Sequence, residues 1–130
     1  PTTIDRSGDR FSGVPKWQTN LTAQYQLDYP CRTGWLEGSV TPRIEWIYES
    51  DIQYAGREVP SLFQPDVHRI NARLTWRFNE DRSEVALWGK NLTDAYYFRN
   101  SIAGTVSTYG FAVRYYEPPR TYGIEVQHRF

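Results

Sequence analysis

The sequence predicts an all-β protein, built as an antiparallel up-and-down meander of about five long strands. Apolar and polar residues alternate with a period of two in five separate segments, which is typical of strands whose two faces meet different surroundings. The links between these segments are alternately short and long, as expected for strands joined by tight turns at one end of a sheet and large loops at the other. No segment shows the 3.6-residue spacing of an amphipathic helix.

The five expected strands cover residues 15–29, 35–48, 67–78, 83–97 and 120–130. In the first, apolar or aromatic residues hold nearly all odd positions from 17 to 29, and the even positions are polar. The second contains Pro42, which removes a ladder hydrogen bond and argues against a central strand, but its alternation continues on both sides. The alternation of the fourth strand breaks near Asn91 and Leu92, where we expect a bulge or a strand end.

The links differ in length and composition. Residues 30–34 and 79–82 are short and rich in turn-forming residues, whereas 49–66 and 98–119 are long loops, and 1–15 looks like the end of another. The chain has no methionine and does not begin with a charged-then-apolar signal segment. We therefore interpret residues 1–130 as a piece of a longer protein.

Strand length and charge placement indicate which solvent each face meets. Strands of soluble proteins average about 5–6 residues, and most of the expected strands are about twice that length. A strand of about 13 residues, tilted by about 45°, rises roughly 30 Å, close to the hydrocarbon thickness of a bilayer. The apolar faces contain no Asp, Glu, Lys or Arg, although 23% of the chain is charged. Such a face is typical of a lipid-facing barrel wall.

The opposite face is too highly charged for a dry core. Its charged positions include Arg43, Glu45, Arg69, Arg73, Arg77, Glu125 and Arg129. We expect them to line a wide, wet or plugged lumen. Pairing across neighbouring strands and contact with a plug are favoured over guidance of a ligand. Aromatic residues gather near the strand ends, as in the interfacial girdles of membrane barrels.

Composition and motifs argue against several classes of function. The 15 basic and 15 acidic residues balance, so no basic footprint for nucleic acid is expected. The single cysteine, Cys31, precludes an internal disulfide, and the two histidines, His68 and His128, are expected at opposite ends of the sheet. No nucleophile elbow or phosphate-binding loop is present. We expect no catalytic residues, no metal site and no cofactor.

Three segments carry recognisable motifs: residues 86–97, Ala-Leu-Trp-Gly-Lys-Asn-Leu-Thr-Asp-Ala-Tyr-Tyr; residues 118–123, Pro-Pro-Arg-Thr-Tyr-Gly, with the alternation that follows; and residues 14–17. Together they resemble TonB-dependent outer-membrane receptors. The first resembles that family's apolar strand followed by Asn-Leu-x-Asp and a tyrosine, the second its last strand, and the third the entry to an earlier strand. The resemblance implies the C-terminal part of a 22-stranded transmembrane β-barrel in the bacterial outer membrane. The short turns would be periplasmic and the long loops extracellular.

The same resemblance implies a transport function rather than an enzyme. The family imports a scarce nutrient, such as an iron chelate (siderophore), cobalamin or a saccharide. TonB supplies the energy through a plug domain that nothing in this sequence matches. The implied partners are outer-membrane lipid, the barrel-assembly machinery, TonB through the missing plug, and the nutrient ligand. The expected barrel-assembly signal is formed by Tyr122, Ile124, Val126, His128 and Phe130.

Two further interpretations come from the residues. Loop side chains that could contact a ligand, because aromatic residues and arginine suit recognition, are Tyr54, Arg57, Phe63, Tyr109, Arg114, Tyr115 and Tyr116. Residues 91–94, Asn-Leu-Thr-Asp, are expected to shape the exit of their strand rather than to bind a ligand. The rival interpretation of the whole chain is a soluble secreted β-module that binds carbohydrate or protein through exposed aromatics.

Overall fold

The computed structural model of the protein describes residues 7–8, 11–29, 37–54, 60–102 and 108–130. The chain divides into two compact units. One, the sheet unit, contains Thr19–Tyr48, His68–Tyr96 and Pro118–Phe130. The other, the loop unit, contains Pro1–Gln18, Glu49–Val67 and Tyr97–Glu117. Among the residues described, no helix has the length and apolar character needed to cross a membrane.

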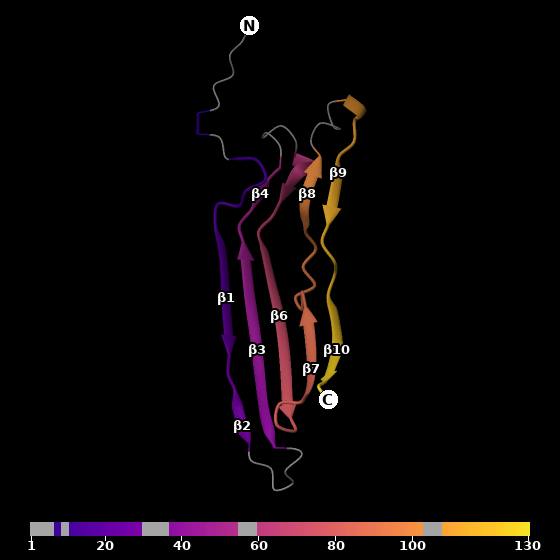
Figure 1. Ribbon diagram of the computed structural model, residues 1–130. Coiled ribbons are helices and arrows are strands. Elements are labelled where there is room, and N and C mark those ends of the chain that lie inside the picture. Colours follow the sequence, from indigo (N-terminus) through magenta and orange to yellow (C-terminus); the bar gives the residue numbers. More distant parts are fainter. Residues whose placement is uncertain (1–6, 9–10, 30–36, 55–59, 103–107) are drawn as a thin grey trace. The chain divides into compact units, whose positions relative to one another are not determined.

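The main sheet confirms the predicted antiparallel meander (Figure 1). Its strands are β1 (Gln18–Gln24), β2 (Leu27–Tyr29), β3 (Gly38–Glu49), β6 (Val67–Phe78), β7 (Ser83–Lys90) and β10 (Thr121–His128). They lie in the order β1-β3-β6-β7-β10, with β2 also paired to β3. Over the described ranges β1 and β10 are the two ends of this order, so the sheet is open and no closed barrel is formed.

The first strand is shorter than predicted and is interrupted, and Pro42 explains the interruption. Leu27 lies opposite Val40, which places Tyr25 opposite Pro42. The Tyr25 N–H donates to the Pro42 carbonyl at 3.1 Å, but Pro42 has no N–H to return to β1. The ladder is therefore broken at residues 25–26, between β1 and β2. Pro42 nevertheless lies inside β3, a central strand, as the alternation predicted.

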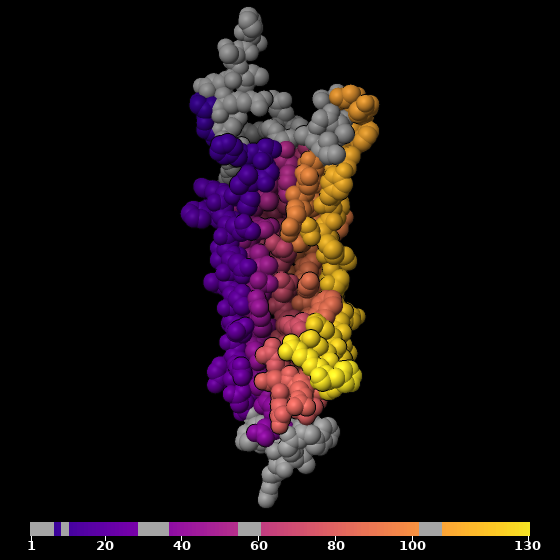
Figure 2. All heavy atoms as spheres, in the orientation of Figure 1, coloured from indigo at the N-terminus to yellow at the C-terminus, as the bar shows by residue number. Residues whose placement is uncertain are grey.

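The pairing register confirms the predicted two-faced alternation. Leu74 of β6 lies opposite Leu87 of β7, which lies opposite Ile124 of β10. The next position along, Arg73 with Trp88 and Gly123, belongs to the other face. Paired residues on neighbouring strands thus lie on the same face of the sheet, so the apolar positions form a continuous surface over these strands. In the space-filling view, side chains of β1, β3 and β6 form adjacent columns (Figure 2).

The prediction that the fourth strand continues to residue 97 is wrong, because β7 ends at Lys90. Asn91 and Asp94 adopt left-handed backbone conformations, with φ of 51° and 53°. The buried Asn91 side chain accepts a hydrogen bond from the Ala95 N–H at 2.9 Å and donates to the Ala95 carbonyl at 3.0 Å. Thr93 donates to the His68 carbonyl at 2.9 Å. The segment therefore shapes the strand exit, as expected for residues 91–94.

The short link between β6 and β7 is a tight turn, as predicted. Asn79, Glu80 and Asp81 all have positive φ, and the Arg82 N–H closes the turn on the Asn79 carbonyl at 3.0 Å. Three consecutive left-handed residues without glycine make this a strained connection. The other short link, residues 30–34, and with it Cys31, lies outside the described residues.

The two long loops contain short strands that the sequence did not predict. In the first, β4 (Ile52–Gln53) pairs with β5 (Phe63–Gln64), which follows a 3₁₀ turn, η1 (Pro60–Leu62). In the second, β8 (Phe98–Ile102) pairs with β9 (Val113–Tyr116) through a bulge. The two-residue strands β4 and β5 are too short for periodicity to be informative. Leu62, Ile52, Val67, Tyr97 and Phe98 are the buried apolar residues of this unit.

Candidate functional site

The polar face of the main sheet carries an ion-pair network across three strands. Arg73 on β6 bonds to Glu125 on β10 at 3.0 Å and to Glu84 on β7 at 3.3 Å. Arg77 also bonds to Glu84, at 2.9 Å. Glu84 thus forms ion pairs with two arginines, and Arg73 forms ion pairs with two glutamates. Pairing across strands is thus observed for Arg73, Arg77 and Glu125, which are among the charges predicted to line the lumen, and contact with a plug stays a prediction.

A second group extends this network to the other side of the sheet. Glu45 on β3 accepts a hydrogen bond from Asn20 on β1 at 3.2 Å and from Asn71 on β6 at 2.8 Å. The Asn71 side chain also accepts the Asn91 N–H at 3.0 Å. Polar side chains therefore bridge β1, β3 and β6 as the ion pairs bridge β6, β7 and β10. These bridges fix strand register on a face that water can reach.

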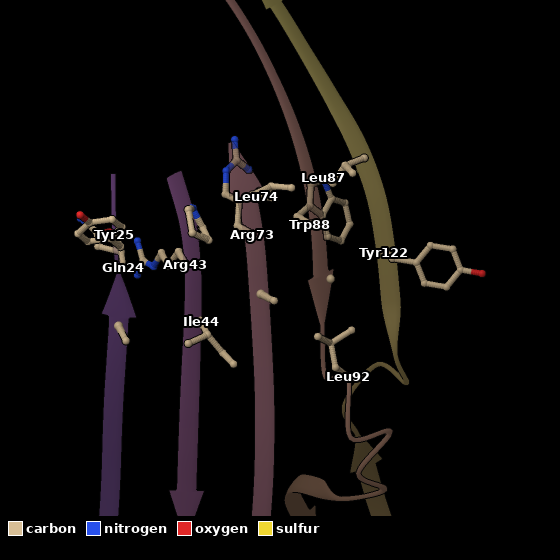
Figure 3. A pocket seen from close by; sticks show the side chains of 14 residues that line it. Gln24, Tyr25, Arg43, Ile44, Arg73, Leu74, Leu87, Trp88, Leu92 and Tyr122 are labelled. Atoms are coloured by element: carbon tan, nitrogen blue, oxygen red, sulfur yellow. The ribbon is translucent and has the colours of Figure 1, made fainter. Parts of the chain in front are cut away.

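The apolar face of the sheet is shallowly hollowed at its centre (Figure 3). The hollow has a volume of about 650 Å³, and small residues form much of its lining, namely Ala23, Pro42, Ala72 and Gly89. Larger side chains, among them Ile44, Leu74 and Leu87, complete it. A Cβ at Gly89 would lie 2.6 Å from the end of the Leu92 side chain, which would have to move aside. The hollow is therefore lined largely by apolar side chains, and the polar side chains of Gln24, Arg43 and Arg73 also border it.

Aromatic side chains gather towards both ends of β6, in agreement with the prediction. At its start, the rings of Trp46, Tyr48 and His68 form a stacked cluster with centroid separations of 4.8–6.1 Å. At its end, Trp76 packs on Phe78 at 4.5 Å. His68 belongs to the first cluster.

His128 lies on β10 and contacts Ser83 of β7 and Phe130. Its Nδ1 lies 2.9 Å from the Ser83 hydroxyl, and its ring packs edge-on against Phe130 at 4.9 Å. The other proposed assembly-signal residues, Tyr122, Ile124 and Val126, are exposed on the apolar face of β10. The described ranges contain no group of three or more His, Cys, Asp or Glu side chains arranged for a metal ion.

Three of the predicted ligand contacts pack within the loop unit, and their contact with a ligand stays a prediction. Tyr54 packs on Phe98 at 5.1 Å, and its hydroxyl lies 2.8 Å from the Arg99 carbonyl and 3.1 Å from that of Phe98. Burial raises the pKa of the Tyr54 hydroxyl. Arg114 lies over the Phe98 ring at 5.2 Å and donates to the Ser61 carbonyl. Tyr116 packs on the same ring at 5.9 Å.

The remaining predicted loop contacts are exposed or outside the described ranges. Phe63, Tyr109 and Tyr115 are exposed, and Tyr109 lies 5.9 Å from Phe111, which is also exposed. Arg57 falls outside the described residues. Phe63, Tyr109 and Tyr115 are accessible to a ligand, and Tyr109 forms an exposed pair with Phe111.

Sequence reasoning missed Gln64 and Phe98. Gln64 is buried, and its side chain accepts the Phe98 N–H at 3.0 Å and donates to the Pro65 carbonyl at 3.1 Å. No pattern in the sequence distinguishes this glutamine from an exposed one. Phe98, by contrast, lies in an aromatic-rich segment that could have been recognised as a packing centre.

Comparisons of the chain with protein-family models, with curated proteins and with solved structures found no match. The strands and their pairing show an all-β protein with antiparallel sheets. No family is identified.

Proposed function

We propose that this chain is part of the barrel wall of a TonB-dependent receptor in the bacterial outer membrane. Such a receptor imports a scarce nutrient, of the iron-chelate, cobalamin or saccharide class, with energy supplied by TonB. The observation that carries the proposal is the contrast between the two faces of one long sheet. One face is apolar and accessible, and the other holds charges that pair across its strands.

The apolar face is unfavourable in water and favourable in lipid. Ile124 and Val126 are 69% and 72% exposed, and Leu74 and Leu87 are nearly half exposed. Burial of each such side chain is worth roughly 1.5–3 kcal/mol, and a contiguous apolar surface of this kind marks a site of contact with a membrane or a partner. A lipid bilayer supplies that burial over the whole face at once.

The polar face supports a wet lumen. Arg73, Arg77, Glu84 and Glu125 keep partial access to solvent, and the network they form is bonded side to side. Transfer of these charges into a dry core would cost more than their pairing returns. A wide barrel with a water-filled or plugged interior places them in contact with water.

The open ends of the sheet support membership of a larger barrel. β1 and β10 each lack a second partner within the described ranges. An open strand edge in lipid leaves backbone N–H and C=O groups unsatisfied, so further strands must complete the wall. The resemblance of residues 86–97 and 118–123 to the family implies that these are the last strands of a 22-stranded barrel.

Detergent dependence tests the proposal directly. We expect the 130-residue chain to aggregate or stay unfolded in plain buffer and to acquire β structure in detergent micelles or with the upstream strands. Far-UV circular dichroism and size-exclusion chromatography measure the two outcomes. A monodisperse monomer that melts cooperatively in plain buffer would exclude the membrane proposal.

The soluble secreted module is a second candidate, supported by the exposed aromatics of the loop unit. Phe63, Tyr109, Phe111 and Tyr115 could stack on sugar rings or anchor a protein partner. This candidate requires folding in plain buffer and loss of binding when Tyr109 and Phe111 are replaced by alanine. The detergent experiment therefore separates it from the membrane proposal.

A further inference from the structure

A second hollow, on the polar face of the main sheet, shares Arg43, Ala72, Arg73, Trp88 and Gly89 with the first and adds Glu45, Asn71, Lys90 and Glu125. It has a volume of about 440 Å³ and is lined by strands β3, β6, β7 and β10. Three cations, Arg43, Arg73 and Lys90, meet two carboxylates, Glu45 and Glu125, around it. The lining residues thus carry three positive and two negative charges, and Glu84, the second partner of Arg73, adds a negative charge beside them.

Two of the three cations have hydrogen-bond donors that no described residue accepts from, although Arg43 interacts electrostatically with Glu45. Arg73 is bonded to Glu84 and Glu125, and Glu45 is held by two asparagine side chains. Arg43 and Lys90 form no hydrogen bond or ion pair with any other residue that the structure describes. They face a hollow whose carboxylates are already engaged, so their donors remain available.

Trp88 holds Lys90 in place without using its donors. The Lys90 ammonium lies 5.7 Å from the centroid of the Trp88 ring, in a cation–π contact. The indole lies across Gly123 of β10, where a Cβ would come within 2.8 Å of the ring. The glycine thus permits the tryptophan to lie against the sheet, and the ring positions a cation at the edge of the hollow.

We infer that this hollow binds a small organic anion through a carboxylate. The Arg43 guanidinium and the Lys90 ammonium are the charged donors, and Trp88 supplies an apolar surface. The volume falls within the range of small-molecule sites, about 300–1,000 Å³, and the planar arginine fork matches a carboxylate in a bidentate contact. The inference rests on the proposed function in one respect, namely that the polar face borders a wet lumen.

Titration with succinate tests the site. The full 130-residue chain is labelled with ¹⁵N, folded in micelles, and followed through the Trp88 indole and Arg43 side-chain N–H signals, with succinamide as the uncharged probe. Succinate is expected to shift both signals saturably, and succinamide is not. Arg43→Gln and Lys90→Gln should each weaken binding at least tenfold. Arg82→Gln, which removes an equal charge from the β6–β7 turn, should leave it unchanged.

The contrary results are equally specific. Equal shifts of the Trp88 and Arg43 signals with succinamide would show that a carboxylate is not what is recognised. Equal weakening of succinate binding by Arg82→Gln would show general charge attraction, and either result would overturn the site. If Arg43→Gln does not fold, Arg43→Lys is used, because lysine keeps the positive charge but lacks the planar guanidinium. Unchanged affinity for succinate in Arg43→Lys would overturn the bidentate contact. Failure of the proposed function would appear separately, as folding without detergent, and the same titration is then run in buffer.

Discussion

Replacement of Ile124 by arginine tests which solvent meets the apolar face. Ile124 is in the middle of β10, is 69% exposed, and lies opposite Leu87 in a row that continues to Leu74. It makes no polar contact that the substitution would break. The new charge would therefore enter whatever medium covers this face, and the change in unfolding free energy reports on that medium.

The size of the effect follows from the position of the residue along the strand. His128 lies on the same strand and face, four positions further on, which corresponds to about 13 Å along the strand. With a tilt of about 45°, the two residues differ in depth by about 9 Å. Arginine near the midplane of a membrane barrel costs about 2–4 kcal/mol, and near the interface about 0–1 kcal/mol. Ile124→Arg should therefore destabilise by about 2–4 kcal/mol. At His128 the inserted charge should cost less than about 1 kcal/mol, and loss of the Ser83 hydrogen bond should add about 1 kcal/mol.

Urea unfolding in phosphocholine vesicles, monitored by tryptophan fluorescence, measures both variants. His128→Arg is the depth control, and it is compared with His128→Ala because both variants lose the Ser83 hydrogen bond and the Phe130 ring contact. On a water-exposed surface Ile124→Arg, and His128→Arg relative to His128→Ala, should change stability by no more than about 0.5 kcal/mol. A value that small for Ile124→Arg would refute the reasoning that lipid covers this face.

Three further variants test individual contacts. Gly123→Ala should destabilise the sheet by about 1–3 kcal/mol, because the added methyl group meets the Trp88 ring; unchanged urea midpoints would contradict this packing. Asn91→Ala should cost more than Asn91→Gly by about 1 kcal/mol, because only alanine is strained at positive φ, and equal costs would remove that argument. Burial raises the pKa of Tyr54 in the folded chain. The contribution of neutral Tyr54 to folding stability is therefore fully present below the ordinary tyrosine pKa of about 10, and it is lost as the pH rises through the higher pKa of the folded chain. Tyr54→Phe should abolish that pH dependence and cost about 1 kcal/mol, measured by hydrogen exchange in the loop unit; a dependence that persists would exclude Tyr54 as its source.

Much of the sheet could be predicted because its information is local. Alternation assigns each side chain to a face without knowledge of the partner strand, and the observed row of Leu74, Leu87 and Ile124 agrees with that assignment. The interruption opposite Pro42 could not be placed, because it depends on which neighbour faces the missing N–H. The strand end at Asn91 was expected only as a break, since its hydrogen bonds reach distant segments.

The candidate sites were less predictable than the fold. Tyr54, Arg114 and Tyr116 carry the residue types of a binding surface, yet they pack around Phe98. Residue type alone does not distinguish a side chain that recognises a ligand from one that supports its own loop. The unpaired state of Arg43 and Lys90 was likewise invisible, because it depends on which carboxylates the neighbouring strands already engage.

The sequence by itself determined the all-β class, the antiparallel order of the long strands and the division of their side chains between an apolar and a charged face. Those properties follow from a period of two and from turn-forming residues, which act over a few positions. Only the tertiary structure decided the exact register, the interruption of the first strand, the hairpins within the long loops and the partners of each charge. These depend on contacts between segments far apart in the chain, whose hydrogen-bond and packing requirements no local pattern contains.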